Sequence, residues 1–143
     1  MKRYMLDTNT VSYLLKGVPS VAKRVVQESM ASLCISSITE GELLFGISKR
    51  PEAKRLHRAV SEFLNRVGVV PWDSAAAESY GKTRAEMELR GKVIAPLDLL
   101  IGCHALSLDY VLVTNDKTFV QLKGLEIEDW TKLNRWRRKT AHW

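Results

Sequence analysis

Short apolar runs alternate along this chain with stretches in which apolar residues recur every three or four positions. The short runs are rich in Val, Ile and Leu, and they predict strands near residues 3–6, 33–36, 69–70, 110–113 and 125–128. The periodic stretches predict helices near residues 9–16, 19–30, 38–48, 51–67, 74–90 and 97–108. Strands that alternate with helices indicate an α/β domain around a mostly parallel sheet of four or five strands.

Proline and capping residues predict where several of these helices begin and end. Pro19, Pro51 and Pro96 each precede a periodic stretch, and proline is favoured at the first helical position. The helix after the second strand has two candidate capping boxes, one beginning at Ser37 and one at Thr39. The helix that starts at Pro51 is expected to end at the next glycine, residue 68.

The chain of 143 residues contains no internal repeat or linker, so we expect one domain, residues 1–130, followed by a basic tail, residues 131–143. The net charge is +6, and the tail carries +5 of it. Such a tail either contacts the phosphates of an RNA or is a solvated end without a role. Its basic residues are Lys132, Arg135, Arg137, Arg138 and Lys139.

The sequence predicts a cytoplasmic protein without a membrane segment. No apolar run approaches the ~20 residues that a membrane helix needs, and Asp7 interrupts any apolar leader near the start. Cys34 and Cys103 lie in apolar stretches without metal-ligand spacing, so we expect buried, reduced thiols.

Four acidic residues stand at the ends of predicted elements. Asp7 follows the first strand, Asp116 follows the fourth, and Glu42 lies in the helix after the second. Asp98 lies among leucines at the start of a helix, where an unpaired buried carboxylate would cost several kcal/mol. Because parallel strands end at one edge of a sheet, and the helix of Asp98 begins there too, the four acids are expected to meet.

Oxygen ligands alone favour Mg²⁺ or Mn²⁺, and the chain lacks the His and Cys cluster that zinc prefers. A cation held in this way can bind a phosphodiester and activate water, which is the chemistry of a nuclease. Each acid also has a purely local interpretation. Asp7 could form an Asx turn, Glu42 could complete a capping box, Asp116 could cap a helix, and Asp98 could interact with a helix dipole.

Five segments in this order resemble the PIN-domain ribonucleases, specifically VapC-type toxins of toxin–antitoxin pairs. They read MLDTN at residues 5–9, SSITEGELLFG at 36–46, LDLLIGCHAL at 97–106, VLVTND at 111–116 and IEDW at 127–130. The resemblance covers residues 3–130 and implies a three-layer fold.

The resemblance also implies roles for particular residues. Asp7, Glu42, Asp98 and Asp116 would be the catalytic acids that bind Mg²⁺ or Mn²⁺, supported by hydrogen bonds from Asn9 and Thr114. Glu40 is a second acid near Glu42, but helical spacing allows only one of the two to face the site, and the motif favours Glu42.

The resemblance further implies an endoribonuclease that cuts a structured RNA, often a tRNA, and so inhibits translation. Its partners would be a second copy of the chain, forming a homodimer, and a small VapB-type antitoxin. Two apolar stripes are larger than one sheet face needs, and part of them is expected to contact a second copy or an antitoxin helix. The stripes are Leu56, Val60, Phe63 and Leu64, and Leu43, Leu44 and Ile47.

Three alternatives remain open from the sequence. An aspartyl-phosphate phosphotransferase commonly has a second acid two residues after the first-strand nucleophile, whereas this chain has Asn9 there. A non-catalytic nucleic-acid-binding module would use the basic tail with Trp136 and Trp143, but it leaves four converging acids unexplained. A PIN nuclease that processes RNA outside a toxin pair would share the whole mechanism.

Overall fold

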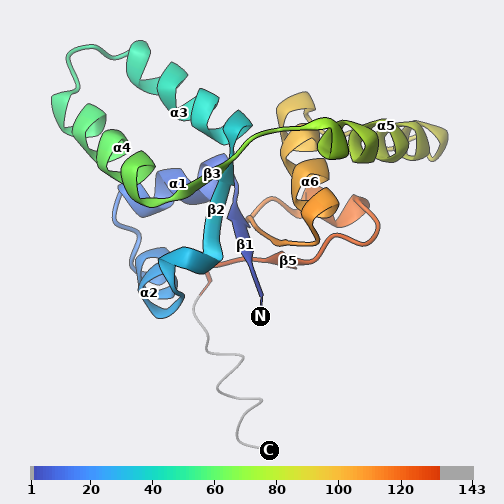
Figure 1. Cartoon of the computed structure of the whole chain (residues 1–143), viewed down its shortest axis with the longest axis horizontal. Coiled ribbons are helices and arrows are strands. Elements are labelled where there is room, and N and C mark those ends of the chain that lie inside the picture. The colour runs from blue at the N-terminus through green and yellow to red at the C-terminus, as the bar shows by residue number, and fades with distance from the viewer. Residues whose placement is uncertain (1, 133–143) are drawn as a thin grey trace, which may run out of the picture.

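The computed structural model describes residues 2–132, and a five-stranded parallel sheet runs through its centre (Figure 1). The strand order is β3-β2-β1-β4-β5, and all four pairs of neighbours are parallel. The strands are β1 (Tyr4–Leu6), β2 (Leu33–Ser36), β3 (Gly68–Val70), β4 (Val111–Val113) and β5 (Ile127–Glu128). The expected parallel sheet of four or five strands is therefore confirmed.

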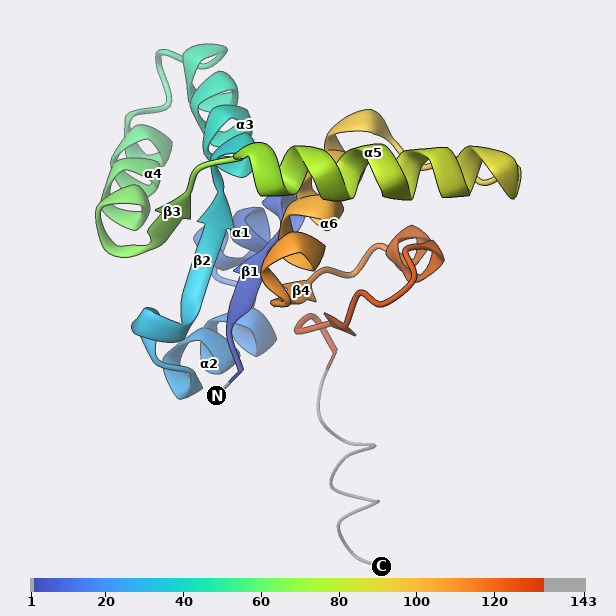
Figure 2. The same cartoon turned by 45° about the vertical axis from the view of Figure 1, so that its right-hand side comes forward.

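Helices cover both faces of this sheet, which gives the expected three layers (Figure 2). The α-helices are α1 (Thr8–Leu15), α2 (Pro19–Gln27), α3 (Ser37–Ser48), α4 (Lys54–Arg66), α5 (Ser74–Leu89) and α6 (Pro96–Leu108). Two short 3-10 helices, η1 (Met30–Ser32) and η2 (Lys117–Gln121), complete the described elements. Among the described residues, no helix is long and apolar enough to cross a membrane.

The alternation of side chains along the strands separates two apolar cores. Tyr4 and Leu6 of β1 join the core that contains residues of α1, α2 and α4, whereas Met5 joins the core that contains residues of α5, α6 and η2. Trp130 is buried in the first core. The body of the domain therefore extends at least to Trp130, the expected boundary of the tail.

The tail is outside this description, apart from its first two residues. Lys132 is exposed, and Arg135, Arg137, Arg138 and Lys139 lie outside the described residues. Cys34 and Cys103 are buried and free, as expected.

Three predictions about helix ends are wrong. Helix α3 is capped by Ser36, whose Oγ accepts from the Ile38 amide at 3.1 Å, so neither Ser37 nor Thr39 is the cap. Helix α4 begins at Lys54, because the residues from Pro51 onward form a turn first. Helix α2 ends at Gln27, since Glu28 is already extended.

Gly68 does not end α4 either. Val67 is the last residue before the strand, and Gly68 is the first residue of β3, paired with Cys34 of β2. Gly102 has a packing role instead. A Cβ at that position would lie 2.7 Å from Leu122 Cδ2 and 3.1 Å from Phe119 Cε1, so any larger residue would force these side chains to shift away from α6.

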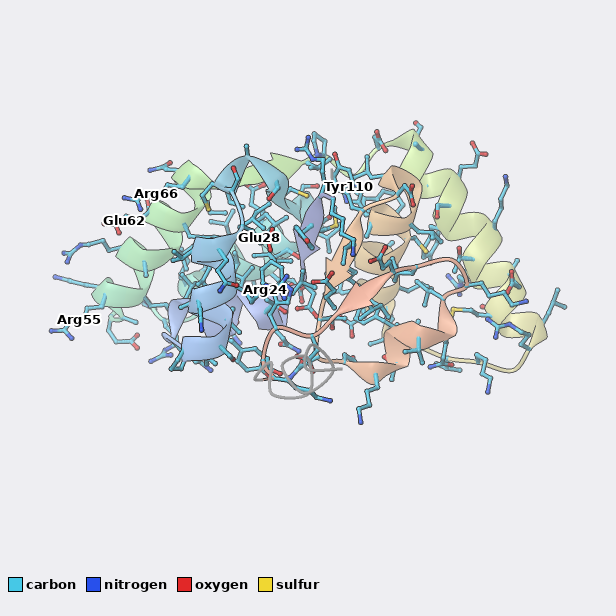
Figure 3. The ribbon with its side chains drawn as sticks, turned by 90° about the horizontal axis from the view of Figure 1, so that it is seen from below. Arg24, Glu28, Arg55, Glu62, Arg66 and Tyr110 are labelled. Atoms are coloured by element: carbon cyan, nitrogen blue, oxygen red, sulfur yellow. The ribbon has the colours of Figure 1, made fainter. Side chains whose placement is uncertain are left out.

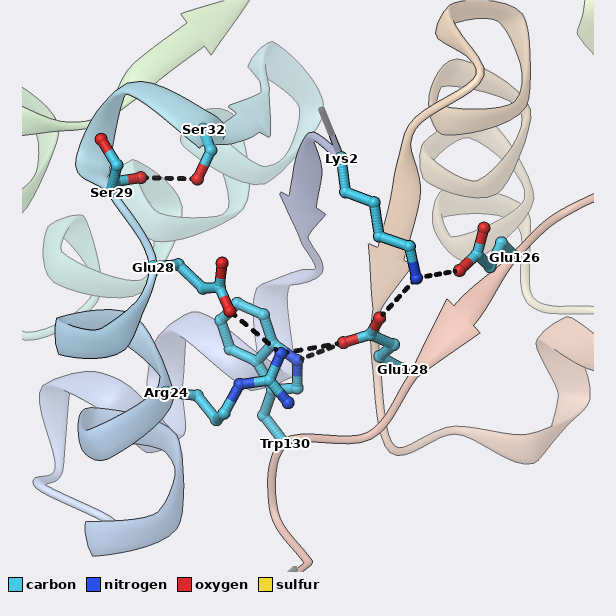
Figure 4. A network of polar contacts seen from close by, with 8 residues as sticks. All are labelled: Lys2, Arg24, Glu28, Ser29, Ser32, Glu126, Glu128 and Trp130. Atoms are coloured by element: carbon cyan, nitrogen blue, oxygen red, sulfur yellow. Dashed lines mark hydrogen bonds and ion pairs between the residues drawn. The ribbon is translucent and has the colours of Figure 1, made fainter. Parts of the chain in front are cut away.

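A polar network joins β5, the outermost strand beside β4, to α2 (Figure 4). Arg24 donates to Glu128 at 3.1 Å and to Glu28 at 3.3 Å, and its guanidinium lies 4.6 Å from the centre of the Trp130 ring. Trp130 Nε1 also donates to Glu128 at 3.0 Å. Burial raises the pKa of Glu128, but the Trp130 and Arg24 hydrogen bonds and the nearby positive charges outweigh it, so the pKa is lowered.

Glu128→Gln should destabilise the protein at pH 7 by about 1–3 kcal/mol, because a charge-assisted hydrogen bond is weakened in a half-buried place. A carboxyl whose folded pKa is lowered stabilises the fold above its unfolded pKa, and this stabilisation is lost as the pH falls through the folded pKa. Denaturant unfolding at pH 7 and near pH 3 should therefore show a difference that shrinks in acid.

Glu126→Gln is the matched control for that measurement. Glu126 contacts Lys2 at 2.8 Å, with both side chains 57% exposed, so its loss should change stability by less than about 1 kcal/mol. Equal effects of the two substitutions at pH 7 would contradict the importance of the network.

Candidate functional site

Asp7 lies directly after β1 and is 3% exposed. It caps α1, since its Oδ1 accepts from the Thr10 amide at 2.8 Å, and the Thr10 hydroxyl donates to the Val113 carbonyl of β4 at 3.0 Å. Burial raises the pKa of Asp7, hydrogen bonds from Thr114 and Thr10 oppose this, and the charge of Asp116 raises it further. Burial is the dominant cause of the raised pKa, so the folded protein disfavours the ionised form of Asp7.

Asp116 lies three residues after Val113, the last residue of β4. It caps η2, and its Oδ1 accepts from the Thr118 amide at 2.9 Å and from the Thr118 hydroxyl at 2.8 Å. Its own amide donates at 3.0 Å to Oγ1 of Thr114, a residue that is 1% exposed. The capping interpretation of Asp116 is thus correct, and Asp7 also caps a helix, where an Asx turn had been the local alternative. Both hydrogen bonds from Thr118 use Oδ1 of Asp116.

Asp98 is the third residue of α6, which begins at Pro96 as expected. Its side chain is half-buried, and its pKa is raised to about 6, first by burial and then by repulsion from Asp116, Asp7 and Glu42. The structure therefore brings the four acids close enough to repel one another. Their expected convergence at one edge of the sheet is confirmed, whereas their catalytic roles stay predictions.

Glu42, in the second turn of α3, is held by a neighbour that sequence reasoning missed. The Thr8 hydroxyl donates to Glu42 Oε1, and it also lies 3.2 Å from the hydroxyl of Thr39. The charge of Glu42 raises the pKa of Asp98, whereas Glu40 has no resolved effect on it, as the helical spacing predicts. In the sequence, Thr8 directly follows Asp7, and Thr39 precedes Glu42 by almost one helical turn. These positions beside the acids were the only indication that the two threonines could contact Glu42.

The two predicted supporting residues differ. Thr114 contacts both Asp7 and Asp116, as described above. Asn9 is exposed in the first turn of α1, and its side chain makes no hydrogen bond with another described residue. Thr10 and Thr8 hold the acids there instead, and the supporting role of Asn9 stays a prediction.

The chemistry of the four acids fits a hard divalent cation. Such a cation prefers carboxylate oxygens, and it would relieve the repulsion that raises the pKa of Asp98. Within residues 2–132, no three acidic, His or Cys side chains already stand at the spacing of a complete metal shell. The four acids therefore affect one another electrostatically, but in this structure their side chains are not arranged as a complete set of metal ligands.

A groove of about 300 Å³ begins beside the acids and runs between α1, α3 and α4. Thr8 and Glu42 lie at its acidic end. Its walls are apolar, and three cations border it. The apolar residues are Leu15, Leu43, Ile47, Leu56 and Val60, and the cations are Lys16, Lys49 and Arg50.

The two apolar stripes are largely used within the domain, so that only part of their surface is left for the expected partner. Leu43, Val60 and Phe63 are buried in the first core, and Ile47, Leu56 and Leu64 are packed against it. On the outer side of these helices, Leu44 and Phe45 are the large apolar residues that stay exposed, at 44% and 62%. The surface available to a partner is thus the groove and this short patch, and not the whole of both stripes.

The PIN domain family model matches residues 4–125, which span strands β1 to β4, the four acids and the groove. This chain belongs to the PIN-domain family. It is 34% identical over 132 residues to the tRNA(fMet)-specific endonuclease VapC of Shigella flexneri, covering 92% of this chain and 100% of the relative. The protein of the same name from Salmonella typhimurium is 37% identical over 131 residues, covering 91% and 99%.

Solved structures agree with this assignment. DNA-bound VapBC from Salmonella typhimurium has a TM-score of 0.85 at 37% identity, covering 91% of this chain and 99% of that chain. VapBC2 from Rickettsia felis, bound to a DNA fragment from its promoter, has a TM-score of 0.82 at 32% identity, covering 89% and 98%. The PIN domain described here is therefore a member of the VapC group, as the motifs predicted.

Asp98→Asn should stabilise the metal-free protein above pH 6. The folded pKa of Asp98 is raised from 3.8 to about 6, so the folded state holds a proton that the unfolded state has released between these values. Stability that depends on this proton is present below the unfolded pKa and is lost as the pH rises through the folded pKa. The melting temperature of the variant should therefore exceed that of the unaltered protein increasingly from pH 4 to pH 7.

Thermal melts in EDTA between pH 4 and pH 7 measure this difference. Glu40→Gln is the control, because Glu40 lies on the same helix as Glu42 without acting on Asp98. A constant gap between Asp98→Asn and the unaltered protein across this range would contradict the raised pKa.

Proposed function

We propose that this PIN domain is an endoribonuclease that depends on Mg²⁺ or Mn²⁺. The observation that carries the proposal is the repulsion of Asp98 by Asp7, Glu42 and Asp116 at the carboxyl edge of the sheet. Clustered carboxylates that repel one another are typical of sites that bind a divalent cation, because the cation neutralises their charge. The names of the relatives from Shigella flexneri and Salmonella typhimurium support a tRNA as the substrate.

Each element of the fold has a part in this chemistry. The strand end and the start of α6 present Asp7 and Asp98, and the end of β4 presents Asp116. The Thr8 hydroxyl orients Glu42, while Thr10 and Thr114 orient Asp7. A bound Mg²⁺ or Mn²⁺ would be held by the four acids and would supply activation of water and stabilisation of phosphate charge.

The proposed biological role is that of a toxin. Cleavage of a tRNA removes a component of translation, and such an enzyme would act in the cytoplasm. The basic residues from Lys132 to Lys139 are proposed to contact RNA phosphates, since the acids alone repel the substrate. A PIN nuclease that processes RNA outside a toxin pair shares the mechanism and differs only in its partner.

Asp98→Asn should abolish metal-dependent cleavage, because it removes one charged ligand while keeping the shape of the side chain. The assay incubates the purified protein with total cellular RNA and Mg²⁺, Mn²⁺ or EDTA, and maps new 5′ ends. Asp7→Ala and Asp116→Ala should have the same effect, and Glu42→Ala a milder one. Glu40→Ala is the control and should cleave normally, whereas undiminished cleavage by Asp98→Asn would overturn the assignment.

The groove between α1, α3 and α4 is the proposed binding site of a VapB-type antitoxin. Its apolar walls fit the apolar face of an amphipathic segment, and Lys16, Lys49 and Arg50 favour acidic residues beside that face. Structures of VapBC complexes among the relatives support this partner. Because Thr8 and Glu42 line the same groove, an occupant would reach the acids and neutralise the enzyme.

The proposed homodimer has a different surface. Leu89, Val93 and Leu97 surround the connection from α5 to α6 and are 88%, 83% and 47% exposed. Exposed aliphatic residues that gather in one region are typical of an interface. Two copies that met here would bring the starts of both α6 helices, and hence both Asp98 residues, toward each other.

Ile47→Glu with Lys49→Glu should reduce copurification with a candidate antitoxin, because it introduces negative charge into the groove. The candidate is the product of a small reading frame immediately upstream, expressed together with the tagged PIN domain. Arg55→Glu is the control for charge reversal, since Arg55 points outward from α4 near the edge of the molecule (Figure 3). Undiminished capture by the double variant would place the partner elsewhere.

A further inference from the structure

His104 is a buried histidine that the proposed chemistry does not use. It lies on α6 and is 1% exposed, among residues that are otherwise apolar or small. Burial lowers its pKa, although the Asp73 carboxylate and the Pro71 carbonyl raise it, so the ring is neutral at pH 7. Its Nε2 is buried and makes no hydrogen bond of ordinary geometry in the described part of the chain, although the Pro71 carbonyl is close enough to act on the ring. An apolar side chain would fill this space without such a cost, which indicates that the other ring nitrogen has a use.

That nitrogen contacts the cap of α3. His104 Nδ1 lies 2.8 Å from the Oγ of Ser36, which is fully buried at the end of β2. Ser36 Oγ already accepts from the Ile38 amide, and its hydroxyl proton has no other acceptor among the described residues. The Ser36 hydroxyl therefore donates to Nδ1 of His104, and the imidazole proton is on Nε2.

Trp72 makes a second link between the same two helices. It lies in the connection from β3 to α5, and its amide donates at 3.0 Å to the Oγ of Ser37, the first residue of α3. Its indole Nε1 donates at 3.0 Å to the Leu100 carbonyl of α6. The two links together, His104–Ser36 and Ser37–Trp72–Leu100, are named here the α3–α6 brace.

The α3–α6 brace joins the two helices that carry Glu42 and Asp98. Helix α3 carries Glu42, and α6 carries Asp98 only two residues before Leu100. Six residues separate Ser36 from Glu42, which is about 9 Å along a helix. A change in the tilt of α3 at its braced end therefore moves Glu42 relative to Asp98, and a displacement of about 1 Å can reduce catalysis by about 100-fold.

We propose that His104 is a positioning residue, which fixes the start of α3 through Ser36 and so sets the place of Glu42 relative to Asp98. The inference rests on the proposed metal-dependent function, since it concerns how the acids are spaced for a cation. It assigns no contact with substrate to His104.

The test compares two substitutions at one position. His104→Phe fills the space but offers no acceptor to Ser36, whereas His104→Asn places an amide oxygen near the position of Nδ1. Isothermal titration with Mn²⁺ should show about tenfold weaker binding for His104→Phe, and His104→Asn should restore most of the affinity. Cleavage should fall through kcat, with KM for the RNA unchanged, because His104 touches no substrate.

A double-mutant cycle separates positioning from general damage to the fold. In a Glu42→Ala background there is no Glu42 carboxylate left to position, so His104→Phe should cause no further loss of Mn²⁺ affinity. Phe63→Leu is the stability control, since Phe63 is buried in the other core and its substitution should lower the melting temperature without changing Mn²⁺ affinity. Additive losses in the cycle, or a loss in Phe63→Leu equal to that in His104→Phe, would overturn the inference.

The unaltered protein shows which proposal has failed. If it binds Mn²⁺ in a manner that requires Asp98, and His104→Phe binds equally well, then His104 does not position the acids and the proposed function stands. If the unaltered protein shows no Mn²⁺ binding that depends on Asp98, the metal-dependent function itself is overturned.

Discussion

Strand β1 pairs in parallel with β2 on one side and with β4 on the other, and the candidate site depends on this arrangement. Parallel pairing sends the carboxyl ends of all three strands to one edge, so the residues that follow them become neighbours. Met5 pairs with Leu112 and Leu6 with Val113, so Thr114 is level with Asp7 beyond the strands, and Asp116 lies two residues further along the chain. The capping hydrogen bonds then fix carboxylates that repel one another, and this repulsion adds to the effect of burial, which is the main cause of the raised pKa of Asp7 and of Asp98.

The groove and the acids are parts of one surface. Thr8 and Glu42 belong to both, because α1 and α3 begin at the carboxyl edge and then diverge from the sheet to form the groove walls. Helix α6 reaches the same edge from the other layer and brings Asp98. The acids are thus supplied from both sides of the sheet, and the contacts between the layers decide their spacing.

Residue patterns were sufficient for the elements and for the convergence of the acids, but not for the contacts that hold them. The range Leu33–Ser36 and the start of α6 at Pro96 followed from local apolar content and from the fixed φ of proline. The cap at Ser36 was missed because Ser37 and Thr39 fit the same local rule, and only packing distinguishes them. The Thr8–Glu42 contact joins residues on different helices, which no periodicity encodes.

The close packing at Gly102 and the pairing of β1 with β4 have a consequence for the order of synthesis. The Thr10–Val113 hydrogen bond joins residues 103 positions apart, so this side of the sheet closes only after almost the whole domain has left the ribosome. Before that moment the chain has neither its β1–β4 pairing nor Asp116. A nascent or prematurely terminated chain without β4 therefore lacks the assembled acids, so any activity that depends on them arises only late in synthesis.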